Sequence, residues 1–124
     1  MSENYSFSFL FNNLPEGLVI QDENGQTMLH NILTSRNNDT FKLANFLITE
    51  KGAKVDILDS GDNSLFHILC SSKHDDDLKI AELLLRHQTP LDTNNKEDVR
   101  PLEKALSVLN LTMIKFLLEN NARV

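Results

Sequence analysis

A six-residue block that recurs at a nearly constant interval is the feature that most constrains the fold of this chain. The block reads TMLHNI at residues 27–32 and SLFHIL at residues 64–69, and it returns in degraded form as RPLEKA at residues 100–105. Successive blocks begin 37 and 36 residues apart. A unit of that length is too small to bury its own apolar face, so such units stack on one another. The pattern therefore predicts a repeat array.

Each block is preceded by a turn signal and followed by a second apolar segment. Five residues before the blocks stand Asp22, Asp59 and Asn95. Aspartate and asparagine favour turns because their side chains hydrogen-bond the nearby backbone. The second apolar segments cover residues 43–48, 80–85 and 113–118. First helices are predicted to begin at Thr27, Ser64 and Pro101. Serine and threonine cap helices, and proline suits the first helical position.

The blocks resemble the T-P-L-H-x-A signature of ankyrin repeats. The resemblance extends to the turn, where that family places an aspartate or asparagine. It also extends to the family's G-A-D-V ending, which here reads GAKV at residues 52–55 and NARV at residues 121–124. The resemblance implies an all-α fold, an ankyrin-repeat solenoid of stacked antiparallel helix pairs joined by hairpin-like turns.

The same resemblance organises the chain as a single domain, residues 1–124, with a half-repeat followed by three repeats. The half-repeat covers residues 1–21 and acts as an N-terminal cap, with a short helix predicted over residues 6–13. The repeats cover residues 22–58, 59–94 and 95–124, and the divergent third repeat serves as the C-terminal cap. Seven helices are expected in all.

Composition argues against several classes of function. The net charge is −6 and the isoelectric point is near 5.1, whereas a nucleic-acid-binding protein needs a stripe of lysine and arginine to neutralise phosphates. No run approaches the roughly 20 apolar residues of a membrane span. The first residues lack the basic start of a signal peptide. We therefore expect a cytoplasmic protein that binds neither nucleic acid nor membrane.

His30 and His67 occupy the fourth position of the first two blocks. The resemblance to ankyrin repeats implies that each histidine hydrogen-bonds the backbone of the neighbouring hairpin and the hydroxyl of its own block. That hydroxyl belongs to Thr27 for His30 and to Ser64 for His67, three residues earlier and so on the same helical face. Glu103 replaces the histidine in the third block, where this network is expected to be absent or rewired.

Two groups of residues could carry chemistry but are better explained by structure. Cys70 lies three residues after His67, yet no third residue orients a base, and ankyrin repeats hold a small buried alanine there. A buried, inert thiol is predicted. His74 and the aspartates that follow it suggest a metal site, but adjacent loop residues rarely converge on one ion. A solvated helix cap formed by Asp76 or Asp77 explains them, so we expect no catalysis, cofactor or metal.

The expected function is the binding of another protein without catalysis. Ankyrin repeats leave positions on the hairpin tips and the concave helix face free for recognition. Here those positions include Glu23, Asn24, Gln26, Thr34, Ser35, Ser60, Asn63, Ser71, Ser72, Lys96 and Glu97. The likeliest centre is the junction of the first two repeats. Aspartates near this junction favour a basic partner, because opposite charge speeds encounter.

Two other roles fit the same features. A small acidic protein without catalytic residues could neutralise a toxin or effector by binding it, as immunity proteins do. A less favoured role is that of a structural protein whose copies assemble end to end. The column Ala44, Ala81 and Ile114 changes from small to large at the last repeat, so the C-terminal end could present apolar side chains for self-association.

Overall fold

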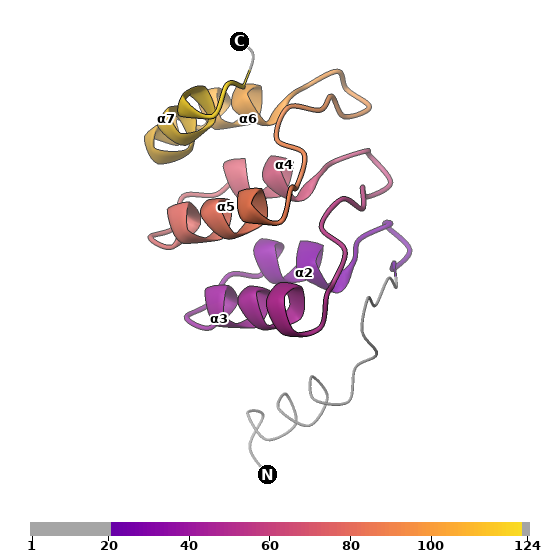
Figure 1. Ribbon diagram of the computed structural model, residues 1–124. Coiled ribbons are helices and arrows are strands. Elements are labelled where there is room, and N and C mark those ends of the chain that lie inside the picture. Colours follow the sequence, from indigo (N-terminus) through magenta and orange to yellow (C-terminus); the bar gives the residue numbers. More distant parts are fainter. Residues whose placement is uncertain (1–20, 123–124) are drawn as a thin grey trace.

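The described part of the chain forms three helix pairs stacked in a single column (Figure 1). The computed structural model of the chain describes residues 21–122. The helix predicted over residues 6–13 lies outside the described residues, as does the rest of the half-repeat except Gln21. The three pairs coincide with the three repeated blocks and the apolar segments that follow them.

The helices of each pair follow one another directly in the chain. The first pair is α2 (Met28–Thr34) and α3 (Thr40–Asn45), and the π-helical turn η1 (Phe46–Glu50) extends α3. The second pair is α4 (Leu65–Cys70) and α5 (Asp77–Arg86), and the third is α6 (Pro101–Ser107) and α7 (Leu111–Glu119). Within residues 21–122 no strand is present, so the chain is all-α as predicted.

The predicted helix starts are correct to within one residue. Thr27 and Ser64 are N-caps, and their helices begin at the next residue. Thr27 Oγ1 accepts a hydrogen bond from the backbone N–H of His30 at 3.4 Å, and Ser64 Oγ accepts one from His67 N–H at 3.3 Å. Pro101 is the first residue of α6, where its missing N–H is not needed.

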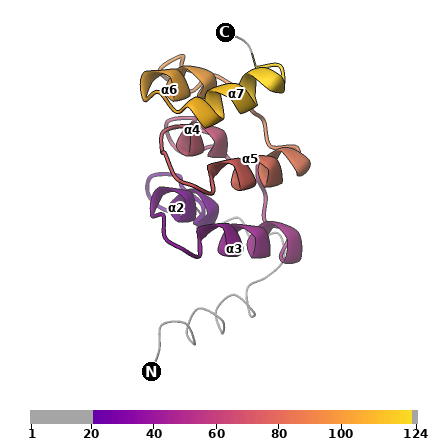
Figure 2. The same ribbon diagram turned by 90° about the vertical axis from the view of Figure 1, so that its left-hand side faces the viewer.

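The helices form two layers, one made of the first helix of each pair and the other of the second helix of each pair. In one layer α2 packs against α4, and α4 packs against α6. In the other layer α3 packs against α5, and α5 packs against α7 (Figure 2). Each pair therefore buries its apolar face mainly against the pairs above and below it, as the short repeat length requires.

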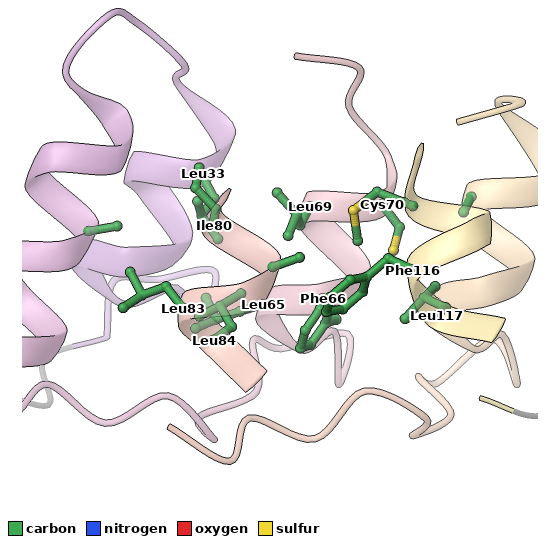
Figure 3. Close-up of a cluster of buried hydrophobic side chains, with 14 of the residues drawn as sticks. Leu33, Leu65, Phe66, Leu69, Cys70, Ile80, Leu83, Leu84, Phe116 and Leu117 are labelled. Carbon is green, nitrogen blue, oxygen red and sulfur yellow. The ribbon is translucent and has the colours of Figure 1, made fainter. Parts of the chain in front are cut away.

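A continuous apolar core runs through the stack. Leu47, Leu84 and Leu117 occupy one predicted column, and their exposed fractions are 3%, 1% and 0%. Phe66 and Phe116 join the second and third pairs, with ring centroids 6.3 Å apart (Figure 3). Each such side chain contributes roughly 1.5–3 kcal/mol on burial, so the column is a main source of stability.

Two equivalent positions have a left-handed backbone in all three repeats. In the turn before each block they are Gly25, Asp62 and Asp98, with φ of 75°, 60° and 62°. After each second helix they are Gly52, Gln88 and Asn121, with φ of 64°, 65° and 71°. Glycine adopts this conformation freely, and aspartate and asparagine tolerate it better than most residues. In the second and third repeats aspartate, glutamine or asparagine replaces glycine at these positions, and the backbone keeps the left-handed conformation.

We expect Leu84→Ala to destabilise the protein by about 2–5 kcal/mol, because it removes buried methyl groups and leaves a cavity. Leu78→Ala on the same helix is the matched control, since Leu78 is 40% exposed. Urea unfolding followed by circular dichroism measures both changes. A loss as large at Leu78 as at Leu84 would contradict this assignment of the core.

Gly25→Ala is expected to destabilise the protein more than Gly52→Ala. Both positions require a positive φ, which costs alanine about 1–2 kcal/mol. A Cβ on residue 25 would also lie 2.6 Å from the backbone nitrogen of Ser60, whereas nothing lies within 4 Å of a Cβ on residue 52. Thermal unfolding of the two variants tests this difference. Equal losses would mean that the first two hairpins do not pack closely.

Candidate functional site

Each hairpin turn is held by the side chain that opens it. Asp59 Oδ1 accepts hydrogen bonds from the backbone N–H groups of Gly61 at 2.9 Å and Asn63 at 2.8 Å. Asp22 and Asn95 make the equivalent pair of bonds in their own hairpins. The acceptor oxygen fixes the turn in all three repeats, and an amide serves as well as a carboxylate.

The hairpins are joined to one another by backbone hydrogen bonds. The N–H of Ser60 donates to the carbonyl of Asn24 at 2.9 Å, and the N–H of Lys96 donates to the carbonyl of Gly61 at 2.9 Å. Three of the predicted recognition residues, Asn24, Ser60 and Lys96, therefore support the stack through their backbone. Their side chains are exposed.

The two block histidines make the predicted bond to the hydroxyl of their own cap residue, with His30 Nδ1 2.8 Å from Thr27 Oγ1 and His67 Nδ1 2.9 Å from Ser64 Oγ. The same ring nitrogens also accept from the backbone of the cap residues. His67 Nδ1 accepts from the backbone N–H of Ser64 at 3.0 Å, and Nδ1 of His30 accepts from Thr27 N–H at 3.1 Å. With Nδ1 as acceptor, the Nε2–H of His67 donates to the carbonyl of Val99 in the next hairpin at 2.7 Å. His67 thus ties the second repeat to the third, as the resemblance implied.

His30 departs from this pattern at its second nitrogen. Its Nε2 has no hydrogen-bond partner among the described residues. The carbonyl of Asn63, at the position equivalent to Val99, still lies close enough to favour the protonated ring. Burial is the larger effect and lowers the pKa of both His30 and His67 below the ordinary value of 6.5, although the facing carbonyl opposes it.

The third repeat rewires this network with a carboxylate. Glu103 Oε1 accepts from the backbone N–H of Arg100 at 3.0 Å, which is the bond that the histidine ring accepts in the other two repeats. Glu103 is exposed, however, and a carboxylate has no N–H to donate to a following hairpin. The predicted divergence of this repeat is confirmed at this position.

We expect stability to fall as the pH drops from 7 towards 5. Because the pKa of both histidines is lowered in the folded state, the unfolded chain binds more protons below its own value of 6.5. The stabilisation is complete above pH 6.5 and is lost as the pH falls through the folded values. Urea unfolding measures the free energy of unfolding at each pH in this range. That free energy should change less steeply with pH in His67→Gln than in the wild type, and His87→Gln, at an exposed position, is the control. An unchanged slope would contradict the assignment.

The structure brings several predicted recognition residues together around one hollow. This hollow has a volume of about 340 Å³ and lies where the first two hairpins meet the first helix layer. It is lined by Gln26, Leu33, Thr34, Asp59, Asn63, His67, Ile68, Ser71, Ser72 and Lys104. Five of these, Gln26, Thr34, Asn63, Ser71 and Ser72, were predicted. The predicted residues that lie outside it are Glu23, Asn24, Ser35, Ser60, Lys96 and Glu97.

Hydroxyl groups recur along this face with a common orientation. Thr34, Ser71 and Ser107 occupy the same position in the three repeats. Each hydroxyl donates to a backbone carbonyl one turn earlier in its own helix, at 2.8, 2.9 and 2.8 Å. The hydroxyl proton is thereby used within the protein, so the oxygen is left as an acceptor.

Sequence reasoning missed one charged residue, Lys104, that lines the hollow. The other charged residue of the lining, Asp59, was predicted both as a turn residue and as one of the aspartates near the junction of the first two repeats. Lys104 enters from α6 of the third repeat. The equivalent positions in the first two repeats hold the uncharged residues Asn31 and Ile68. A charged residue at this position in the third repeat alone is the sequence signal for Lys104.

The loops between paired helices contain a buried polar cluster around Asp77, which was predicted to be a solvated helix cap. Arg36 Nη1 lies 2.9 Å from Asp77 Oδ1, and the guanidinium also pairs with Asp76. The side chains of Arg36 and Asp77 are 4% and 2% exposed. Asn110 Nδ2 lies 3.4 Å from Asp77 Oδ2 and donates to the carbonyl of Ser72. The interpretation of Asp77 as a solvated cap is therefore wrong, because an arginine from the preceding repeat neutralises it in the interior.

Cys70 is fully buried, as predicted. Burial, followed by the charge of Asp77, raises the pKa of its thiol to about 12. Since the thiolate is the reactive form, this thiol is a poor nucleophile at neutral pH. Residues 21–122 contain no group of three or more histidine, cysteine, aspartate and glutamate side chains that could hold a metal ion.

The C-terminal end of the stack presents apolar side chains. Leu106 is 45% exposed, whereas Leu33 at the same position of the first repeat is 2% exposed. Leu118 is 47% exposed, whereas its counterpart Ile48 is 3% exposed. These positions are covered by the next pair in the interior of the stack. In the described structure nothing covers them at the end of the third pair.

Comparison with known proteins supplies no relative: no family model matches the chain, and no curated protein shows significant similarity to it. None of the helices in the described part of the chain has the length and apolar character needed to cross a bilayer.

Proposed function

We propose that this chain is an ankyrin-repeat protein that binds another protein through the hollow and the neighbouring hairpin tips, without catalysis. The observation that carries the proposal is the convergence of Gln26 and Thr34 from the first repeat with Asn63 and Ser71 from the second. A hollow lined by apolar and polar side chains of stacked units is a suitable place for a segment of a partner protein.

Recurrent backbone features support the family assignment. The paired left-handed positions, the capped helices and the hairpin-to-hairpin bonds repeat from one unit to the next. Both histidines bond their own cap residue, and His67 also bonds the next hairpin, as the resemblance to ankyrin repeats implies. These features agree with an ankyrin-type array and go beyond the recurrence of apolar residues.

The distribution of charge supports a basic partner. The three hairpin turns carry six carboxylates and one lysine: Asp22, Glu23, Asp59, Asp62, Lys96, Glu97 and Asp98. The facing helices α2 and α4 carry no lysine, arginine, aspartate or glutamate. The hairpin edge therefore gives this side of the molecule a negative field that attracts a basic surface and speeds encounter. A cytoplasmic location belongs to the same proposal.

The decisive experiment blocks the hollow by substituting bulky residues for small or polar ones in its wall. Ser71→Tyr and Gln26→Trp place bulky side chains at its wall, and Lys42→Trp on the exposed face of α3 is the matched control. A partner captured from the source cell and then purified should bind the hollow variants at least about tenfold more weakly by calorimetry. The control should bind normally, and all three proteins should melt like the wild type.

Normal binding by both hollow variants would overturn the proposal. The same conclusion would follow if substitutions in the loop at residues 73–76 abolished binding while the hollow variants did not. Partner capture alone decides nothing, because a protein can be retained through any exposed surface.

A second candidate role is self-association through the C-terminal end. The exposed Leu106 and Leu118 favour it, because their counterparts in the first repeat, Leu33 and Ile48, are buried. Light scattering over a range of concentrations should then detect an oligomer that Leu106→Gln with Leu118→Gln abolishes. A monomer at all concentrations would exclude this role for the chain.

A further inference from the structure

We propose that the hollow recognises the guanidinium group of a single arginine side chain on the partner and disfavours a run of basic residues. This inference rests on the proposed function and specifies the chemistry of the same site. It follows from the balance of donors and acceptors in the hollow and from the two charges that line it.

Apart from the Lys104 ammonium and the Gln26 amide, the polar side chains of the hollow mainly present acceptors. The hydroxyls of Thr34 and Ser71 have already given their protons to backbone carbonyls. Ser72 Oγ likewise donates to the carbonyl of Leu69 at 3.0 Å. Both ring nitrogens of His67 are occupied, one by Ser64 and the other by Val99. A ligand that fits this wall must therefore supply hydrogen-bond donors.

Asp59 adds a charged acceptor with spare capacity. Its Oδ1 accepts two backbone bonds in the hairpin turn. Its Oδ2 accepts from Asn63 Nδ2 at 3.3 Å, which uses one of the two lone pairs on that oxygen. A guanidinium is planar and carries five donors, so it can bond a carboxylate and neighbouring hydroxyls at once. An ammonium group offers fewer fixed directions for the same set of acceptors.

The apolar lining suits the rest of an arginine side chain. Leu33 and Ile68 contribute to the wall between the polar groups. The three methylenes of arginine can lie against such a surface while the head group remains hydrogen-bonded. The hollow, at about 340 Å³, has room for one side chain and the adjoining backbone.

Lys104 limits how many positive charges the site accepts. Its side chain lines the hollow from the third repeat, so a second cation beside the arginine would face an ammonium group. An acidic neighbour would instead be attracted to it. The preferred segment is therefore one arginine flanked by neutral or acidic residues.

The test uses three short peptides and nuclear magnetic resonance of the ¹⁵N-labelled protein. The peptides are acetylated and amidated Ala-Arg-Asp, Ala-citrulline-Asp and Ala-Arg-Lys. Ala-Arg-Asp should shift the amide signals of Asn63 and Ser71. The citrulline peptide has the same shape without the charge, and it should bind about tenfold more weakly because a charge-assisted hydrogen bond is lost. Ala-Arg-Lys should also bind more weakly than Ala-Arg-Asp.

Two variants assign the effect to particular residues. Asp59→Asn should weaken Ala-Arg-Asp binding and leave the fold unchanged, since Asn95 holds the third hairpin with an amide oxygen in the same place. Lys104→Gln should remove the preference for Ala-Arg-Asp over Ala-Arg-Lys. Equal binding of arginine and citrulline peptides, or shifts located away from the hollow, would overturn the inference.

The inference and the proposed function can fail separately. If hollow-filling variants abolish binding of the partner protein but no arginine peptide binds, the arginine inference is wrong and the proposed function stands. If the partner protein binds the hollow-filling variants normally, the proposed function is wrong whatever the peptides do.

Discussion

The hydrogen bonds that fix each hairpin turn are the interactions on which the rest of the structure depends. One side-chain oxygen, from Asp22, Asp59 or Asn95, accepts two backbone N–H groups and holds the turn in a single shape. Identical turns can then bond to one another along the stack. The helix pairs follow the spacing that the turns set, so the apolar columns meet in register.

The same arrangement separates the stabilising residues from those available for binding. Stacking uses the apolar columns, the backbone of the hairpins and His67, while exposed side chains such as Glu23, Thr34 and Ser71 lie outside the core. Asp59 belongs to both groups, because one of its oxygens holds the turn and the residue also lines the hollow. A change at this residue therefore has to preserve an acceptor if the turn is to survive.

Local regularities in the sequence predicted much of the fold but little of its long-range polar chemistry. The cap residues, the histidine bonds and the leucine column repeat at a fixed interval, so comparing the repeats was sufficient to find them. The ion pair between Arg36 and Asp77 has no such signature, because it joins loops of two repeats and occurs once. The π-helical turn η1 (Phe46–Glu50) also escaped prediction, since its side-chain pattern resembles that of the α-helices in the other repeats. Lys104 reaches the hollow only because α6 stacks on α4.

The buried cluster around Asp77 has a consequence for how the array comes apart. In an ideal repeat array each unit interacts only with its neighbours, and an end unit can detach alone. Here one carboxylate in the central unit is neutralised by Arg36 from the first and contacted by Asn110 from the third. Detachment of the first unit would break this buried ion pair in addition to the apolar contacts between the two units. Fraying from that end is thereby penalised, and loss of order spreads through the three units together.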